Sequence, residues 1–473
     1  MRASSEHLYL LPIGGTAMAP LAGLLHDLGH RVEGVDSQLY PPMSTLLAEL
    51  AIPVRLGFDP ARLPAAIDRV VIGNAVPRSN PEVAAVLERG IPYLSQAEAV
   101  AHYVLARGQD SLVVAGTHGK TTTSSMLAFI LEATGCDPSF LIGGVPRWSG
   151  RPYRRGGGRQ IVIEGDEYNT AFFDRGPKFF HYRPHLFVLG PVEFDHGDIY
   201  RDLDAVLTAF RAGAAMVPRH GAVVVNAFSE GALAAARDAA ARVVTVGPEP
   251  GSTLQLTPTA HTADRSTATI RWQGQDHRLE IPMAGEHNLH NAAMAVAAAA
   301  VCGVEPGSAV AAMARFPGVV RRLEVIGEAA GVTVVDDFAH HPTALAATIA
   351  AARQRWPGRR LVVAFEPRSI TAARRAFQDA YAAALAGADM ALVAVPFHRD
   401  RLEASLVLDR RTLAEDLRQR GVEALVPDDD PVAALAPQLA AGDVVLGCSS
   451  GSFGDFHRRL LQALRGDERT TDS

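Results

Sequence analysis

The feature that most constrains this chain is a glycine loop that contains one of its two lysines. Residues 112–131 read LVVAGTHGKTTTSSMLAFIL, an apolar strand, a glycine turn, Lys120 and a threonine run that opens an apolar helix. The backbone N–H groups of such a loop and the helix N-terminus form a positively polarised nest for phosphate. The lysine then reaches the terminal phosphates and the next hydroxyl reaches Mg²⁺. The segment therefore predicts a nucleotide triphosphate site in an α/β sheet.

This loop is shorter than the general phosphate-binding loop, because only Thr117 and His118 separate its glycines. A glycine turn with an incidental lysine is the alternative, but the flanking strand and helix favour a phosphate site. The residues predicted to surround the phosphates are Gly116, Thr117, His118, Gly119, Lys120, Thr121 and Thr122.

Length, charge and cysteine content restrict the class of protein. At 473 residues the chain exceeds the size of one hydrophobic core, which predicts several domains. A formal net charge of −6 argues against binding to nucleic acid or to a membrane surface. The three cysteines are scattered, and the chain shows neither a signal-peptide pattern nor a membrane-spanning run. These features predict a cytoplasmic protein without membrane insertion.

Strand and helix patterns alternate along the chain, which predicts an α/β fold with three domains. Residues 1–108 begin with a strand at His7–Leu11, a glycine turn, a helix to Leu28 and a strand that ends at Asp36. This outline is typical of a Rossmann-like domain. Pro12 stands where a dinucleotide-binding GxGxxG motif would have its first glycine.

The remaining boundaries follow from the same patterns. A helix at Tyr93–Arg107 is expected to connect the first domain to a central domain at residues 109–318. The central sheet is predicted to be mostly parallel, with a small antiparallel section at residues 254–283. Residues 319–464 alternate strands and helices again and predict a second Rossmann-like domain. The polar tail at residues 465–473 is predicted to be disordered.

Two predicted strands of the central domain are followed by groups that suit a metal ion. Glu164 ends the strand at residues 160–164, and His196 follows the strand at residues 186–189. Ligands of open α/β sheets bind beyond the carboxyl ends of strands, where carboxylate and imidazole can hold Mg²⁺ or Mn²⁺. With the hydroxyl of Thr121, these two residues are the predicted metal ligands. An acidic surface turn and a structural histidine are the alternatives.

Polar groups also mark an alanine-rich helix and the third domain. Asn288 and Asn291 lie one turn apart and can bind a purine edge, although Asn288 could instead cap the helix. The third domain carries groups at its predicted strand ends that suit phosphate and carboxylate binding across a cleft. They are Arg321, Arg322, Asp336, Asp337, His340, His341 and Arg368. A surface role is the alternative for any one of them.

Taken in order, these segments resemble the Mur ligase family, ATP-dependent amide ligases of peptidoglycan assembly. The shared motifs are GTHGKTTT, EGDEY, EFDH, GEHNLHN, RRLE, DDFAHHPT and EPRS. Two family branches share the GGTAM-like loop and DDxxHHP, and they join either L-alanine or a murein tripeptide to UDP-N-acetylmuramate. The segments YPPMSTLL, LIGGVP, AFFDRGPKFFHY and GSFGDFHRRLL resemble the tripeptide branch.

The resemblance implies specific site residues. ATP is expected at the loop residues above and at Asn291, Arg322 and Asp337, with Mg²⁺ at Thr121, Glu164 and His196. The implied catalytic residues are Lys120, Glu164, His196, His341 and Arg368, the last two near the incoming amine. The UDP-sugar is expected at Gly14, Gly15, Thr16, Asp36, Asn74, Arg78 and Asn80.

The implied reaction joins L-alanyl-γ-D-glutamyl-meso-diaminopimelate to UDP-N-acetylmuramate through an acyl phosphate, in peptidoglycan recycling. Ligation of L-alanine in peptidoglycan synthesis is the alternative within the family. A dehydrogenase and a non-catalytic nucleotide-binding regulator are alternatives from other classes. The missing GxGxxG argues against the first, and the presence of Lys120, Glu164 and His196 argues against the second. A monomer or weak homo-oligomer is expected.

Overall fold

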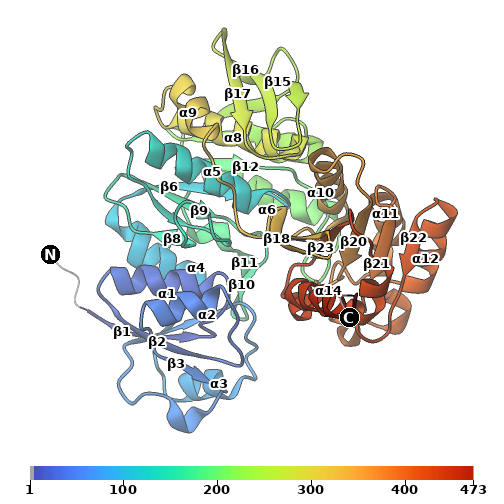
Figure 1. Cartoon of the computed structure of the whole chain (residues 1–473). Coiled ribbons are helices and arrows are strands. Elements are labelled where there is room, and N and C mark those ends of the chain that lie inside the picture. The colour runs from blue at the N-terminus through green and yellow to red at the C-terminus, as the bar shows by residue number, and fades with distance from the viewer. Residues whose placement is uncertain (1–4, 472–473) are drawn as a thin grey trace.

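A computed structural model describes residues 5–471 and confirms the α/β class. Three sheets occupy successive parts of the chain and form three lobes, coloured blue, green to yellow, and orange to red in Figure 1. Among the residues described, no helix is both long and apolar enough to cross a bilayer.

The first lobe contains a parallel sheet in the order β3-β2-β1-β4-β5, an order typical of a Rossmann-like half. Its strands are β1 (His7–Leu11), β2 (Arg31–Asp36), β3 (Val54–Leu56), β4 (Arg69–Ile72) and β5 (Tyr93–Ser95). Its helices are α1 (Met18–Asp27), α2 (Met43–Glu49), α3 (Pro81–Glu88) and α4 (Gln96–Ala99).

The helix predicted at Tyr93–Arg107 is wrong at its start. Tyr93 pairs with Val70, so the first three residues form the edge strand β5. Ser95 then caps α4 by accepting a hydrogen bond from the Glu98 N–H at 3.1 Å, and the Glu98 side chain closes a capping box. The chain continues through short π and 3₁₀ turns to Arg107.

The central lobe contains a ten-stranded sheet in the order β17-β16-β15-β14-β13-β12-β6-β9-β7-β8. Its strands are β6 (Asp110–Ala115), β7 (Ser139–Leu141), β8 (Tyr153–Arg154), β9 (Gln160–Glu164), β12 (Leu186–Leu189), β13 (Ala222–Asn226), β14 (Arg242–Gly247), β15 (Leu254–His261), β16 (Ser266–Trp272) and β17 (Gln275–Ile281). A separate hairpin pairs β10 (Asn169–Ala171) with β11 (Asp174–Pro177). The helices are α5 (Lys120–Ala133), α6 (Leu203–Ala215), α7 (Glu230–Ala236), α8 (Glu286–Val301) and α9 (Pro306–Met313).

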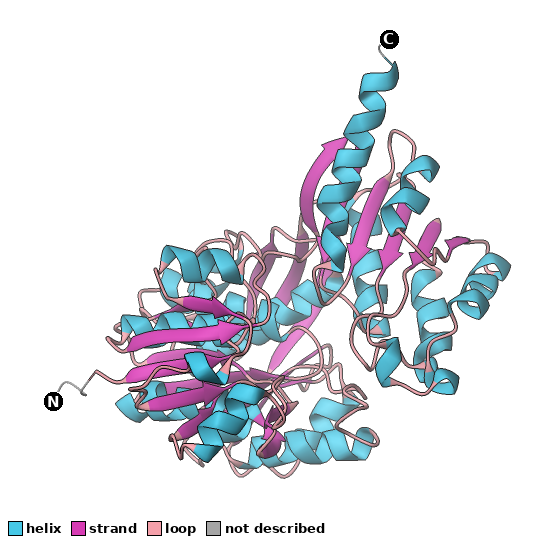
Figure 2. Ribbon diagram, turned by 90° about the horizontal axis from the view of Figure 1, so that it is seen from below, coloured by secondary structure: helices cyan, strands magenta, loops and turns pink. Residues whose placement is uncertain are grey.

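The pairing in this sheet confirms the predicted mixture of parallel and antiparallel strands. Strands β6, β9, β12, β13 and β14 run parallel, whereas β15, β16 and β17 form the antiparallel section. Helices lie on both faces of the sheets (Figure 2), which explains why residues 112–115 of β6 are buried and apolar. The strand order places β12, β6 and β9, whose ends carry the predicted site residues, next to one another in the middle of the sheet.

The third lobe contains a sheet in the order β18-β19-β23-β20-β21-β22, parallel except for the edge strand β18. Its strands are β18 (Glu324–Ala329), β19 (Val332–Asp337), β20 (Leu361–Phe365), β21 (Met390–Val393), β22 (Glu423–Leu425) and β23 (Val444–Cys448). Its helices are α10 (Pro342–Arg355), α11 (Gln378–Leu385), α12 (Arg410–Gln419), α13 (Pro431–Leu435) and α14 (Phe456–Thr471).

Helix α14 corrects the prediction of a disordered tail at residues 465–473. The helix continues past Leu464 to Thr471 and projects beyond the third sheet in Figure 2. Arginine and glutamate in this segment favour a helix whereas Gly466 disfavours one, so composition alone does not decide between helix and coil. Residues 472–473 of the predicted tail lie outside the described residues.

The first two lobes share apolar packing that the third lobe does not join. One continuous cluster of buried side chains runs from the first lobe into the central lobe, and Tyr153 packs beneath Gly23 of α1. The apolar clusters of the third lobe are made of its own residues, apart from Ala284. Its contacts with the central lobe near the phosphate loop include a 2.6 Å hydrogen bond from Thr343 to Glu193 and the stacked rings of Phe194 and Phe377.

Candidate active site

The predicted phosphate loop connects β6 to α5 through two glycines with left-handed backbone angles. Gly116 has φ +127° and Gly119 has φ +76°, a region that residues with a Cβ rarely adopt. A Cβ on Gly119 would also lie 2.4 Å from Asn291 Oδ1. The loop therefore fits closely against α8, and Gly119 serves as the N-cap from which α5 begins at Lys120.

Two cavities meet at this loop. The larger, of about 720 Å³, is lined by the central and third lobes, and the smaller, of about 300 Å³, is lined by all three. Predicted nucleotide residues that line the larger cavity are His118, Gly119, Thr122, Asn291, Arg322 and Asp337. Predicted residues that line the smaller cavity are Thr16, Thr117, Lys120, Thr121, Glu164, His196 and Arg322.

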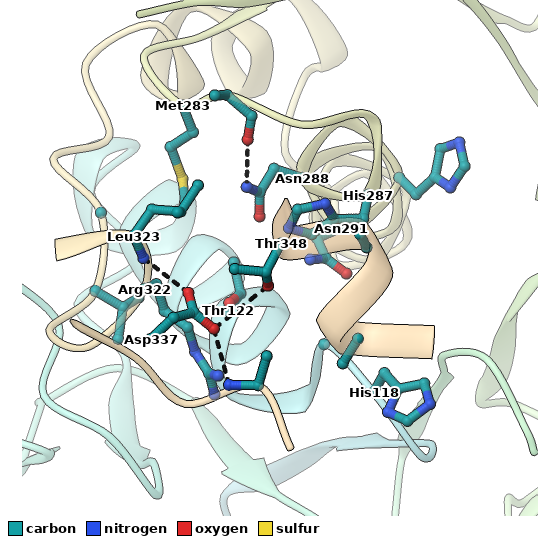
Figure 3. A pocket seen from close by; sticks show the side chains of 18 of the residues that line it. His118, Thr122, Met283, His287, Asn288, Asn291, Arg322, Leu323, Asp337 and Thr348 are labelled. Atoms are coloured by element: carbon teal, nitrogen blue, oxygen red, sulfur yellow. Dashed lines mark hydrogen bonds between the residues drawn. The ribbon is translucent and has the colours of Figure 1, made fainter. Parts of the chain in front are cut away.

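The larger cavity places amide groups of α8 near the link to the third lobe. Figure 3 shows Asn288 and Asn291 on the same cavity as Arg322 and Asp337. Asn291 Oδ1 accepts a hydrogen bond from Thr123 at 3.2 Å, which orients its amide. The Asn288 amide donates to the Ala284 carbonyl at 2.7 Å, whereas Gly285 is the N-cap, so the alternative of N-capping by Asn288 is wrong.

Asp337 organises the link between the central and third lobes. Its carboxylate accepts hydrogen bonds from the backbone N–H groups of Leu323 and Ala339, each at 2.8 Å, and Figure 3 shows the bond from Leu323. Burial raises the pKa of Asp337, and these bonds with the nearby charge of Arg322 oppose that rise. Burial lowers the pKa of Arg322. Asp337 therefore holds the segment that presents Arg322 to both cavities.

Lys120 forms a buried ion pair whose partner has no assigned function in the sequence analysis. Its Nζ donates to Glu167 at 2.8 and 3.1 Å and to the Gly116 carbonyl at 2.8 Å. Burial alone would lower the pKa of Lys120, but the carboxylates of Glu167 and Asp166 raise it above its usual value. The EGDEY motif contains Glu167, yet only the fold brings this carboxylate to the lysine.

The metal ligands predicted from the sequence all line one cavity. Thr121 and Glu164 contact each other there, whereas His196 forms an ion pair with another residue. Thr121 Oγ1 lies 2.9 Å from Glu164 Oε1, and the Gly143 N–H donates to the other carboxylate oxygen at 2.7 Å. These paired oxygens fit a hard ion such as Mg²⁺. His196 Nε2 instead lies 3.2 Å from Glu167 Oε1. Burial opposes the charged imidazole, but Glu167 raises the pKa of His196 to about 9, so the ring must lose a proton before it can bind a metal.

The second lysine of the chain lines the same smaller cavity as Lys120. The side chain of Lys178 is 2% exposed and donates to Asp166 at 3.0 Å and to the Tyr168 hydroxyl at 3.4 Å. Its Nζ also lies 4.6 Å from the centre of the Tyr168 ring. Lys178 is not among the site residues predicted from the sequence, although the rarity of lysine in this chain is a usable signal.

Two residues expected near the incoming amine lie outside the walls of both cavities. His341 is buried, and its Nε2 lies 3.3 Å from the Phe194 carbonyl oxygen. Arg368 lies 3.5 Å from Glu366 and stacks over the Phe397 ring at 3.9 Å. A catalytic function of His341 and Arg368 stays a prediction.

The residues expected to bind a UDP-sugar lie at the carboxyl ends of the first sheet. Asp36 accepts a hydrogen bond from the Gly14 N–H at 2.8 Å and thus fixes the loop that contains Gly15 and Thr16. Asn80 is buried and caps α3, with the Glu82 N–H at 2.9 Å. The other two residues predicted to bind the UDP-sugar, Asn74 and Arg78, are exposed in the loop between β4 and α3. Of the set, Thr16 alone lines the smaller cavity.

Three family models match successive parts of the chain. The model "Mur ligase family, catalytic domain" matches residues 7–107, and "Mur ligase middle domain" matches residues 114–299. The model "Mur ligase, glutamate ligase domain" matches residues 321–451. The matched ranges correspond to the three sheets.

Full-length relatives show the same similarity. The chain is 39% identical over 460 residues to UDP-N-acetylmuramate–L-alanyl-γ-D-glutamyl-meso-2,6-diaminoheptandioate ligase of Escherichia coli K12, covering 97% of this chain and 98% of the relative. It is 35% identical to UDP-N-acetylmuramate–L-alanine ligase of Paenarthrobacter aurescens, covering 98% of each. A crystal structure of a murein peptide ligase from Psychrobacter arcticus matches with a TM-score of 0.77 at 33% identity, covering 98% of this chain and 99% of that one. With its loop lysine, its cavities between three lobes and this full-length similarity, the chain belongs to the Mur ligase family.

Proposed function

We propose that this protein is an ATP-dependent ligase that joins the tripeptide L-alanyl-γ-D-glutamyl-meso-diaminopimelate to UDP-N-acetylmuramate. The observation that carries the proposal is the meeting of two cavities at the phosphate loop, where His118 and Gly119 line one and Lys120 and Thr121 line the other. A nucleotide in the larger cavity can direct its phosphates toward the smaller one. Similarity to the Escherichia coli tripeptide ligase over 97% of this chain supports the substrate class.

The same arrangement supports a division of substrates among three domains. We assign the UDP-sugar to residues 1–108, ATP to residues 109–318 and the amino substrate to residues 319–464. Thr16 of the first lobe and His340 of the third lobe both line the smaller cavity with Lys120, so groups from all three domains reach one reaction space. Closure of the lobes around that space would exclude water from a reactive acyl phosphate.

The chain's own groups suit the proposed transfer of the ATP γ-phosphate to the lactyl carboxylate. Lys120 supplies a permanent positive charge at the loop, because nearby carboxylates raise its pKa. Thr121 and Glu164 would hold Mg²⁺, which neutralises phosphate charge when bound. Positioning of carboxylate, phosphate and amine then supplies much of the rate increase, without a covalent enzyme intermediate.

A direct comparison of amines tests the proposal. Purified protein with saturating ATP, Mg²⁺ and UDP-N-acetylmuramate is given either the tripeptide or L-alanine, and phosphate release and ligated product are measured together. We expect a far higher kcat/KM with the tripeptide. Preference for L-alanine would favour the synthetic branch, which the 35% identical relative from Paenarthrobacter aurescens represents. Phosphate release that needs neither amine nor sugar nucleotide would contradict both.

We also propose that the enzyme acts in the cytoplasm, in peptidoglycan recycling, and so contributes to cell-wall biogenesis, cell shape and division. The three cysteines are free, as expected for a reducing compartment. A monomer or weak homo-oligomer is the proposed assembly, and light scattering across a concentration series tests it.

A further inference from the structure

Three side chains of metal-binding type meet where the phosphate loop contacts the third lobe. We call them the interlobe cluster: His118 of the phosphate loop, Glu193 after β12, and His341 at the N-cap of α10. One ligand atom from each lies within 4.8 Å of the others. The cluster contains none of the residues assigned to Mg²⁺.

Two of the three ligand-atom distances within the interlobe cluster are close to those of a tetrahedral site, and the third is at most 4.8 Å. His118 Nε2 lies 3.3 Å from Glu193 Oε2, and His341 Nδ1 lies 3.7 Å from the same oxygen. Nitrogen and oxygen ligands about 2.0–2.1 Å from Zn²⁺ at tetrahedral angles lie roughly 3.3–3.4 Å apart. Small side-chain movements are therefore enough to form the site.

The hydrogen bonding of His341 points independently to a ligand. Its side chain is 7% exposed, and its buried Nδ1 has no hydrogen-bond partner. Its Nε2 lies 3.3 Å from the Phe194 carbonyl, so the ring proton belongs on Nε2 and Nδ1 carries a lone pair. Metal-bound histidines commonly donate their second N–H to a carbonyl in this way. Burial, with His118 nearby, lowers the pKa of His341 to about 4, which keeps the ring neutral.

Glu193, like His341, is oriented by a hydrogen bond to a neighbouring group. Thr343 Oγ1 donates to Glu193 Oε2 at 2.6 Å, and His118 approaches that oxygen from the phosphate loop. The hydrogen bond to His118 holds the pKa of Glu193 at about 2, so the carboxylate is ionised. The cluster thus combines an ionised carboxylate, a neutral imidazole with a free lone pair and a second imidazole.

We propose that the interlobe cluster is a second metal site, which takes a transition-metal ion of the Zn²⁺ class in preference to Mg²⁺. Two imidazoles and one carboxylate are a ligand set of zinc sites that keep a fourth position open, whereas Mg²⁺ favours oxygen ligands. His118 comes from the phosphate loop and His341 from the third lobe, so a bound ion ties these lobes together. Because His118, Glu193 and Thr343 also line the larger cavity, the ion would lie at the wall of the proposed nucleotide site.

Titration of the full-length protein with Co²⁺, without nucleotide, tests the site independently of ligase activity. We expect saturable binding of one Co²⁺ per chain at this site, with the visible absorption of a four-coordinate ion, displaced by Zn²⁺ but not by excess Mg²⁺. Substitutions His118→Gln and Glu193→Gln each remove a ligand and should weaken Co²⁺ binding by more than about 100-fold. Thr343→Val removes only the hydrogen bond to Glu193 and should weaken it by about 10-fold.

Two further variants make the result specific. His181→Gln removes a histidine that lies 2.6 Å from Asp174, away from both cavities, and should leave Co²⁺ affinity unchanged. The double variant Glu164→Gln/His196→Gln removes two of the three ligands assigned to Mg²⁺ and should keep the four-coordinate spectrum. Loss of that spectrum in the double variant, together with its retention in His118→Gln, would overturn the proposal. Absence of saturable Co²⁺ binding in the unsubstituted protein would overturn it as well.

Unfolding measurements guard against misfolded variants. Zn²⁺ that binds only the folded chain raises its melting temperature. We expect that rise for the unsubstituted protein and for His181→Gln, and its absence for His118→Gln. Equal rises in all three proteins would place the ion elsewhere and contradict the proposal.

Discussion

Glu167 holds Lys120 in a buried ion pair, with 2.8 Å between the carboxylate and Nζ. The same carboxylate lies 3.2 Å from His196 Nε2, so one acid joins the phosphate-loop lysine to an imidazole that follows another strand. A phosphate that binds Lys120 must therefore compete with Glu167, or share the lysine with it. The ion pair with Glu167 keeps the Lys120 ammonium group in place while no phosphate is bound.

Replacement of Lys120 by methionine should abolish nucleotide-dependent ligation. The change removes the charge assigned to phosphate, and we expect kcat to fall by at least about 100-fold. It also leaves Glu167 with fewer partners in a buried place, which should lower the free energy of unfolding by about 3 kcal/mol. A ligation assay measures kcat and chemical unfolding measures stability, while calorimetry shows whether ATP binding is weakened.

Lys178→Met is the matched control for that substitution, because it also breaks a buried lysine–carboxylate pair, with Asp166 at 3.0 Å. We expect this variant to be destabilised to a similar degree while it still binds ATP. Unchanged ATP affinity in Lys120→Met would contradict the assignment of Lys120 to the phosphates.

The ion pair of His196 predicts how stability depends on pH. The pKa of His196 rises from 6.5 to about 9 in the folded protein, against the opposing effect of burial and because of Glu167. The resulting stabilisation is fully present below pH 6.5 and is lost as pH rises through about 9. Its upper limit is about 3 kcal/mol. Urea unfolding across this range should show a steeper loss for the unsubstituted protein than for Glu167→Gln, and parallel curves would refute the prediction.

Gly119 packs so closely against Asn291 that a larger side chain should impair catalysis as well as strain the backbone. Alanine at Gly119 adds a Cβ 2.4 Å from Asn291 Oδ1, whereas alanine at Gly135, with φ +81°, meets nothing within 4 Å. Both changes should cost about 1 kcal/mol of stability, because both residues have left-handed backbone angles. Only Gly119→Ala should displace the loop and lower kcat/KM for ATP, on the order of 100-fold. Equal kinetics for the two variants would show that the contact with Asn291 does not matter.

Arg368 allows a test of the amino-substrate assignment. Its side chain is 25% exposed, lies beyond the end of β20 and lines neither cavity. If it binds a carboxylate of the tripeptide, Arg368→Ala should raise KM for the tripeptide roughly 10-fold or more, with KM for ATP unchanged. Arg399→Ala, an exposed arginine of the same lobe, is the control. A matched rise in KM for both substrates would instead indicate a structural function.

Local sequence was sufficient to predict the glycine loop between β6 and α5 and the strand ends around it. A strand, two glycines and a helix start within a few residues leave little choice of backbone, so the function of Lys120 could be expected without a structure. The start of the Tyr93–Arg107 segment was misread because Tyr93–Ser95 is too short to show a strand period and becomes a strand only through pairing with β4. The tail at residues 465–471 was predicted wrongly because polar composition does not distinguish a helix from a coil.

The sequence by itself thus determined the loop, the alternation of the longer strands and helices, and the family motifs, because each depends on neighbouring residues. The tertiary structure decided which groups face one another. β6 lies between β9 and β12, in register at Val114 with Glu164 and at Ala115 with Leu189, so the ends of three strands meet at the loop. That alignment brings Glu167 to Lys120 across 47 positions of sequence. Contact between the lobes brings His341 to the Phe194 carbonyl across 147 positions, a proximity that no local pattern encodes.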